Sequence, residues 1–147
     1  MSRQLEHKPE LVTGWSRGID VAIARRMVRE GADVALTYVS RPDQAEATVK
    51  TAQAVRVNAF AIRSDSAKVP TLVAAVERTV QELGGIDILV NSAGIALVEP
   101  IDSYRPENFD RTLAVNVRAA FVVILAAPRS EERSVRITRL PREGLSA

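Results

Sequence analysis

The chain is poor in the residues that most metal sites and covalent mechanisms use. Among its 147 residues there is no cysteine and a single histidine, His7. The missing cysteines exclude disulfides, thiol nucleophiles and zinc–cysteine sites, and any multi-histidine metal centre or serine–histidine–aspartate triad would depend on His7 alone. His7 lies in a polar N-terminal segment, where a solvated side chain is expected. We therefore predict no metal site.

Lysine and long apolar runs are scarce as well. The three lysines, Lys8, Lys50 and Lys68, are the candidates for any mechanism that needs a catalytic lysine. No apolar run reaches about 18 residues, and the N-terminal segment has no signal-peptide core, so we expect no membrane span and a cytoplasmic location. The net charge of +2 comes without a basic run, and nucleic-acid binding is not indicated.

Short β-rich runs alternate with longer helical stretches along most of the chain. Strands separated by helices indicate parallel βαβ units. Because crossovers are right-handed, we predict an α/β fold of the Rossmann type, a doubly wound parallel sheet in the order 3-2-1-4 that stops after the fourth strand and its following helix. The predicted strands are 11–13, 33–38, 58–65 and 86–94, and the predicted helices are 19–31, 43–54, 68–85 and 106–127.

Gly14 and Gly18 lie in a strand-to-helix loop of the kind that holds a phosphate. The stretch LVTGWSRGID (11–20) leads from a strand through both glycines into a helix. The missing Cβ of Gly14 permits a tight turn. Gly18 lets the backbone approach a pyrophosphate that rests on the N–H groups and the positive dipole end of the helix. The loop predicts a dinucleotide site, and a turn without a ligand is the alternative.

Four segments, in this order, resemble the short-chain dehydrogenase/reductase family. They are LVTGWSRGID (11–20), RSDSA (63–67), NSAG (91–94) and NFDRTLAVNV (108–117). The nearest likeness is to 3-oxoacyl-carrier-protein reductases and related NADP-dependent members. It covers roughly residues 3–127, the first half of a typical member. The resemblance implies interconversion of carbonyls and alcohols by hydride transfer.

The resemblance implies roles for single positions. Asp65 would bind the adenine amino group, and Asn116 would hold a water in the proton relay of the active site. Without the family, Asp65 is a turn residue at a strand end and Asn116 is a polar interruption of an apolar helix. The positions that match cofactor-binding segments of the family are Gly14, Ser16, Arg17, Gly18, Ile19, Asp65, Ser66, Asn91, Ala93 and Gly94.

The end of the second predicted strand favours NADP over NAD. NAD-specific sites place an acid there to bind the ribose 2′-hydroxyl, whereas this chain has Tyr38, Ser40 and Arg41. The guanidiniums of Arg17 and Arg41 suit a 2′-phosphate, because arginine makes charge-assisted and often bidentate hydrogen bonds. Solvated surface arginines are the alternative.

Four residues depart from the family pattern in the first segment. Asp20 replaces the third glycine, and its carboxylate is expected to compete with a pyrophosphate for the N–H groups of the first helical turn. Trp15 puts a large ring into a loop of small residues. Pro9 and Glu10 stand at the entry to a central strand that should be apolar on both faces. Together these departures predict weakened cofactor binding.

The catalytic pair of the family is missing. The resemblance implies a tyrosine that donates a proton to the carbonyl and a lysine four residues later. In this chain Pro42 stands at that spacing after Tyr38, and Asn108 stands there after Tyr104. Asn116 is the one member of the catalytic set that is present. We therefore expect no turnover from the chain by itself.

Residues 128–147 differ in composition from the rest. They hold five arginines, three serines, three glutamates and two prolines, and 135–140 is too polar for the fifth strand of such a sheet. We interpret 1–127 as the NAD(P)-binding half of a short-chain reductase and 128–147 as an atypical tail foreign to the family. The helix 106–127 is apolar all round and must be buried somewhere, so we expect self-association or pairing through it.

Three functional interpretations stay open. The chain is an oxidoreductase-family protein that is inert alone, a non-catalytic nucleotide- or partner-binding module that associates with an intact relative, or a truncated product without function. A cofactor titration separates the first two from the third, and co-purification with an intact relative identifies the second.

Overall fold

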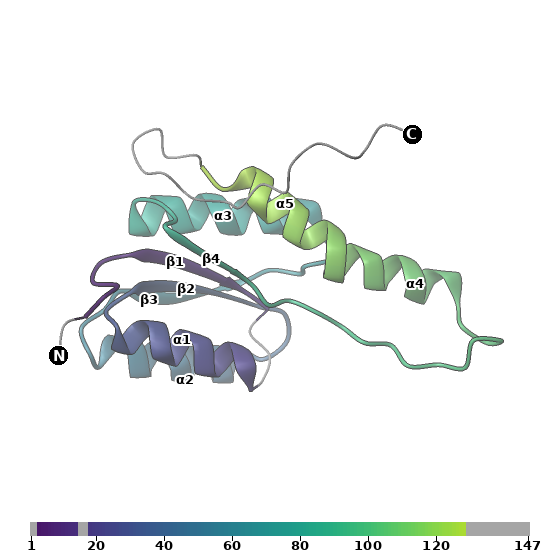
Figure 1. Ribbon diagram of the computed structural model, residues 1–147, viewed down its shortest axis with the longest axis horizontal. Coiled ribbons are helices and arrows are strands. Elements are labelled where there is room, and N and C mark those ends of the chain that lie inside the picture. Colours follow the sequence, from purple (N-terminus) through teal and green to yellow (C-terminus); the bar gives the residue numbers. More distant parts are fainter. Residues whose placement is uncertain (1–2, 15–17, 129–147) are drawn as a thin grey trace.

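One parallel sheet of four strands organises the fold. The computed structural model describes residues 3–14 and 18–128 (Figure 1). The sheet has the order β3-β2-β1-β4 and all its neighbouring strands are parallel. The predicted doubly wound α/β class and the strand order 3-2-1-4 are therefore confirmed. The strands are β1 Pro9–Thr13, β2 Asp33–Tyr38, β3 Ala59–Arg63 and β4 Ile88–Asn91.

Helices cover both faces of this sheet (Figure 1). Helices α1 and α2 lie on one face, and α3 and α5 lie on the other. Since alternate strand residues point to opposite faces, Leu11 joins the core under α3 and α5, while Val12 joins the core under α1 and α2. The helices are α1 Ile19–Arg29, α2 Pro42–Gln53, α3 Val69–Leu83, α4 Pro106–Leu113 and α5 Ala119–Ala126.

The central strand β1 begins earlier than predicted and carries a buried acid. Pro9 opens the strand, and its carbonyl accepts a hydrogen bond from the N–H of Asp87 at 2.8 Å. Glu10 follows, fully buried between Val34 on β2 and Ile88 on β4. In the part of the chain that the structure describes, neither carboxylate oxygen of Glu10 has a hydrogen-bond partner. Burial raises the pKa of Glu10 to about 8.

The predicted helix 106–127 is interrupted by a wider turn. A π-helical segment, Ala114–Arg118, joins α4 to α5, and Asn116 lies in its middle. The Asn116 Oδ1 accepts a hydrogen bond from the N–H of Ile95 at 2.8 Å, and its Nδ2 donates one to the carbonyl of Ile95 at 2.9 Å. This pair of bonds ties the π-helical turn to the loop after β4. Apolar periodicity does not reveal such a turn, because the surrounding residues stay helical.

Large apolar side chains line the outer side of α4 and α5. Ala119 and Val123 pack in the core between α3, α5 and the sheet, and Ala114 and Val115 are buried as well. The opposite side of the same helices is open, and α4 projects beyond the sheet (Figure 1). No helix among residues 3–14 and 18–128 is long and apolar enough to cross a membrane. We call the exposed apolar set the outer stripe; it consists of Phe109, Leu113, Val117, Phe121, Ile124 and Leu125.

Candidate functional site

A cleft of about 280 Å³ opens at the carboxyl ends of the strands. All four strands contribute to it through the loops that follow them, and α4 and the π-helical turn close one side. Ligands of open parallel sheets bind at this edge, where the strand order reverses, here between β1 and β4. The lining residues are Gly14, Thr37, Val39, Ser40, Arg41, Ser64, Asp65, Ser66, Ala93, Gly94, Ile95, Arg111 and Val115.

The floor of the cleft is bare main chain where β1 and β4 end. Gly14 has a φ of +83°, and a Cβ on it would lie 2.2 Å from the Cα of Ala93. Its N–H donates to the Thr37 hydroxyl at 3.0 Å, and the N–H of Ser92 donates to the Thr13 carbonyl at 3.3 Å. The predicted need for a residue without Cβ at Gly14 therefore has a geometric cause, since no side chain fits between the two strand ends.

The N-terminus of α1 stands beside this floor. Gly18 is the N-cap, with a φ of +66°, and a Cβ on it would meet open space. Ile19 is 74% exposed. As a glycine, Gly18 has no side chain that could cap the helix, and the positive end of the α1 dipole favours an anion here. Gly18 and Ile19 do not line the cleft themselves. Trp15, Ser16 and Arg17 lie outside the described residues.

The carboxylate of Asp20 is turned inward. Asp20 is 5% exposed and accepts a hydrogen bond from the hydroxyl of Ser92, in the loop after β4. The sequence predicts this carboxylate among the N–H groups that a pyrophosphate would use. In the structure it lies between α1 and the β4 loop, and Asp20 does not line the cleft.

The residues after β2 and β3 form the far wall of the cleft. Ser40 and Arg41 are exposed at its rim. Asp65 lies beside them, half-buried, and its Oδ1 accepts a hydrogen bond from the N–H of Ala67 at 3.0 Å. Tyr38, in contrast, packs against the core under α1 and α2 and does not reach the cleft. Of the three residues predicted at the end of the second strand, the structure brings Ser40 and Arg41 to the cleft.

Two other predicted residues lie near the cleft without lining it. Asn91 ends β4 in register with Thr13, and its side chain is exposed. Asn116 contributes indirectly, because its side chain forms hydrogen bonds with the backbone of Ile95, and Ile95 lines the cleft. The predicted residues that the cleft brings together are Gly14, Ser40, Arg41, Asp65, Ser66, Ala93 and Gly94.

Six of the described residues that line the cleft are not among those predicted from the sequence. Arg111, on α4, matters most for the charge of the cleft, because it adds an exposed guanidinium to that of Arg41. It lies inside the segment 108–117 that carries the family resemblance, yet no local charge pattern marks it. The others are Thr37, Val39, Ser64, Ile95 and Val115.

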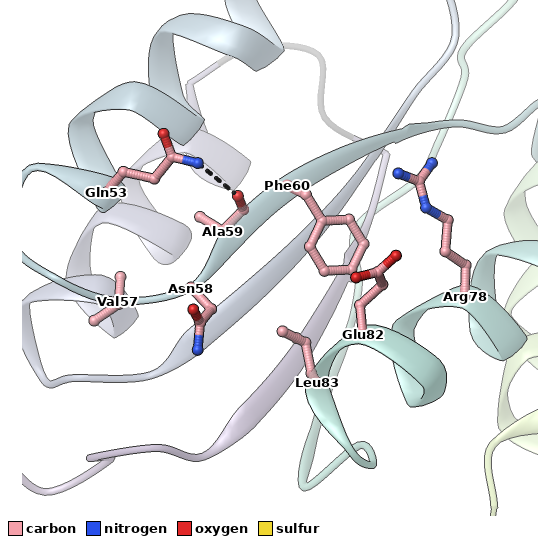
Figure 2. Close-up of a pocket in the computed structure, with 8 residues that line it drawn as sticks. All are labelled: Gln53, Val57, Asn58, Ala59, Phe60, Arg78, Glu82 and Leu83. Atoms are coloured by element: carbon pink, nitrogen blue, oxygen red, sulfur yellow. Dashed lines mark hydrogen bonds between the residues drawn. The ribbon is translucent and has the colours of Figure 1, made fainter.

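A second cavity, of about 300 Å³, lies beside the start of β3, away from the carboxyl ends of the strands (Figure 2). Gln53 Nε2 donates to the carbonyl of Ala59 at 3.2 Å, and the Arg78 guanidinium lies 5.4 Å from the centre of the Phe60 ring. Val57, Asn58, Glu82 and Leu83 complete the lining. None of the residues predicted for the site lies here, so the cleft at the carboxyl ends is the candidate site.

Comparison with known proteins identifies relatives of about twice this length. Residues 8–137 match the family model for short chain dehydrogenases, and the match runs past residue 127. The 3-oxoacyl-[acyl-carrier-protein] reductase FabG of Staphylococcus epidermidis is 35% identical over 115 residues, which make up 78% of this chain and 47% of that protein. The chain thus spans about half the length of the curated relatives that it matches.

Solved structures share the fold of the described residues. A short chain dehydrogenase from Burkholderia cenocepacia in complex with NADP is 45% identical, with a TM-score of 0.82 over 84% of this chain and 51% of that one. A blue fluorescent protein from a metagenomic library, in complex with NADPH, is 44% identical, with a TM-score of 0.80 over 83% of this chain and 50% of that one. The family model covers most of the chain, and Gly14 of the glycine loop lines the cleft. This chain belongs to the short-chain dehydrogenase family.

Proposed function

We propose that the chain binds NADP(H) in the cleft at the carboxyl ends of its strands, as the cofactor-binding half of a short-chain reductase. The observation that carries this proposal is the contact between Gly14 and Ala93, where a Cβ would lie 2.2 Å from the neighbouring backbone. It leaves a floor of main chain that a phosphate-bearing ligand can approach closely. The N-terminus of α1 stands next to that floor, and the positive end of its dipole attracts anions.

The charges around the cleft favour NADP over NAD. Among the described residues that line the cleft, Asp65 is the one acid, and it follows β3 rather than β2, where an NAD-specific site needs an acid. Ser40 and Arg41 follow β2 and offer donors suited to a 2′-phosphate. Arg111 adds positive potential from α4. The two relatives solved with NADP and NADPH support the same choice.

We further propose that the chain alone does not reduce carbonyls. Hydride transfer requires the cofactor, an acid and the substrate to be aligned to within about 3–3.5 Å. The described residues form the cofactor side of such a site. Neither Tyr38 nor Tyr104 has a lysine four residues later, and Tyr38, which is partly buried against the core under α1 and α2, does not line the cleft. The residues of this chain would therefore bind and orient the cofactor without delivering a proton.

The outer stripe supports a second candidate function, a non-catalytic module that pairs through α4 and α5. Six large apolar side chains are exposed along α4, the π-helical turn and α5. An exposed apolar surface of this kind marks an association site. The partner would be a second copy of this chain or an intact relative, and cofactor binding is compatible with either.

A titration combined with an activity assay tests the primary proposal. The full chain is titrated with NADPH and with NADH while nicotinamide fluorescence is followed, and NADPH oxidation is then assayed with a β-ketoacyl thioester and a simple ketone. We expect saturable binding, tighter for NADPH, and no oxidation above background. A folded chain that binds neither dinucleotide would contradict the binding proposal. Saturable turnover that Asn116→Ala abolishes would contradict the catalytic one.

A further inference from the structure

Helix α4 forms part of one wall of the cleft although none of its residues is buried. Arg111 of α4 lines the cleft together with Val115 of the π-helical turn. All residues of α4 are at least partly open to solvent, and the helix projects beyond the sheet (Figure 1). Its Asn108 side chain bonds to Glu99, in the loop that precedes it. Because tertiary packing supplies most of what holds a helix in place, the position of this wall depends on the π-helical turn to which α4 is joined.

The π-helical turn is bonded to the loops that follow both outer strands of the sheet, β3 and β4. A backbone hydrogen bond within it spans five residues, so the turn holds one residue more than an α-helical turn. On one side, Asn116 bonds to the backbone of Ile95, in the loop after β4. On the other side, Arg118 Nη2 donates to the carbonyl of Ala67, in the loop after β3, at 3.2 Å.

The loop after β3 is a firm anchor for this second bond. The N–H of Ala67 donates to Asp65 Oδ1 at 3.0 Å, and the carbonyl of Asp65 accepts from the N–H of Lys68 at 2.9 Å and from the Thr71 hydroxyl at 2.8 Å. The loop therefore keeps its shape without Arg118, whereas α4 has no buried residue of its own. The bond from Arg118 thus places α4 relative to the loop that carries Asp65, and not the reverse.

We propose that Arg118 is a positioning residue, which holds α4 at the cleft so that the guanidinium of Arg111 faces the bound dinucleotide. The inference rests on the proposed function and extends it to a residue that does not itself line the cleft. Arg118 also lies one residue beyond the segment 108–117 that carries the family resemblance. A charged donor makes a stronger hydrogen bond than a neutral one, and the carbonyl of Ala67 gives that bond a fixed direction.

Spin-label distances test the placement of α4 without any cofactor. The chain has no cysteine, so labels can be attached at Glu46→Cys on α2 and Asp110→Cys on α4, both of which are exposed positions. We expect one narrow distance distribution in the otherwise unchanged chain and a broader one when Arg118→Ala is added. Arg118→Lys keeps a charged donor on a long side chain and should restore the narrow distribution. A label pair at Glu46→Cys and Glu77→Cys, on α2 and α3, is the control and should not respond to Arg118→Ala.

A double-mutant cycle then tests whether Arg118 acts through Arg111. NADPH dissociation constants are measured for the parent, Arg118→Ala, Arg111→Ala and the double variant, with melting temperatures as the check of folding. We expect Arg118→Ala to weaken NADPH binding about fivefold in the parent and less than about twofold in the Arg111→Ala background. Arg118→Gln, which shortens the side chain and keeps it polar, should behave like Arg118→Ala. Arg29→Ala is the matched control, since it removes an exposed arginine of α1 that does not line the cleft.

The outcomes separate this inference from the proposed function. Equal losses of NADPH affinity for Arg118→Ala in both backgrounds would show that Arg118 does not act through Arg111. Unchanged label distances between α2 and α4 in Arg118→Ala would show that other contacts hold the helix, and either result would overturn the inference. A folded parent chain that binds no NADPH would instead contradict the proposed function itself.

Discussion

Gly14 and Ala93 meet through their backbones, and a Cβ added to Gly14 would lie 2.2 Å from the Cα of Ala93. Gly14→Ala should therefore force the ends of β1 and β4 apart. Gly14 also has a φ of +83°, which costs a residue with a side chain about 1–2 kcal/mol before any clash is counted. We expect a loss of at least about 2 kcal/mol in unfolding free energy and no measurable NADPH binding. Urea unfolding and fluorescence titration check the two effects.

Gly85→Ala is the control for that substitution. Gly85 follows α3, and a Cβ there would meet nothing within 4 Å. The Gly85→Ala variant should have the same unfolding free energy and the same NADPH affinity as the parent chain. If Gly14→Ala behaves like Gly85→Ala, the close approach of the two strands does not shape the cleft.

Arg41→Ala should reduce the preference for NADPH over NADH. Arg41 is exposed at the rim of the cleft beside Ser40, where a 2′-phosphate is proposed to lie. A charge-assisted hydrogen bond of about 1.5–3 kcal/mol corresponds to at least about a tenfold loss of NADPH affinity, with NADH affinity unchanged. Parallel titrations with both dinucleotides measure the ratio. Arg25→Ala is the control, because it removes an exposed arginine of α1 outside the cleft. An equal drop in NADPH affinity in both variants would show that the loss comes from net charge and not from a contact with the 2′-phosphate.

Asn116→Ala should loosen the loop after β4. Both amide atoms of Asn116 bond to the backbone of Ile95, at 2.8 and 2.9 Å. Because each bond contributes about 0.5–1.5 kcal/mol net, the loss of both should speed hydrogen exchange at the Ile95 amide by about fivefold or more. Asn108→Ala is the matched control, since that asparagine bonds to the Glu99 side chain instead. Unchanged exchange in Asn116→Ala would show that other contacts hold the loop.

Glu10 should make the fold less stable as the pH rises. Its pKa is raised from 4.5 to about 8 by burial, so between these values the folded state keeps a proton that the unfolded state has lost. The stability that this proton provides is fully present below pH 4.5 and is lost as the pH rises through about 8. The slope is at most about 1.4 kcal/mol per pH unit. Urea unfolding at several pH values within this window measures it.

Glu10→Val should flatten that pH dependence and stabilise the fold at pH values near the upper end of the window. Valine suits a central strand between Val34 and Ile88, and it removes the buried carboxyl. Glu77→Gln alters an exposed acid of α3 and should keep the slope of the parent. If the unfolding free energy of Glu10→Val changed with pH as steeply as that of the parent, the pH dependence would belong to another group.

The outer stripe should make the chain associate. Phe121 on α5, Val117 in the π-helical turn and their stripe neighbours on α4 and α5 are exposed, so we expect a dimer or larger species, or binding of a hydrophobic dye in buffer. Phe121→Glu should shift sedimentation toward the monomer and reduce dye binding. Val98→Glu replaces an exposed apolar residue outside the stripe and should leave the assembly unchanged. A compact, dye-silent monomer of the parent at micromolar concentration would contradict this prediction.

The sequence by itself determined the sheet order and much of the cleft. Alternating strands and helices with right-handed crossovers allow few arrangements, and the predicted order 3-2-1-4 is the observed one. The segments that resemble the short-chain reductase family assigned Asp65 and Ala93 to one site, and both residues line the cleft at the carboxyl ends of the strands. Both inferences depend on local patterns, which neighbours along the chain determine.

Only the tertiary structure decided which partners these residues meet. Asp20 and Ser92 are 72 residues apart, and nothing local indicates that the carboxylate turns toward that hydroxyl. The bonds from Asn116 to Ile95, the position of Arg111 in the cleft and the packing of Tyr38 in the core arise in the same way. Each depends on how helices and loops settle on the finished sheet, where burial and hydrogen bonding between distant segments outweigh the preferences of the residue itself.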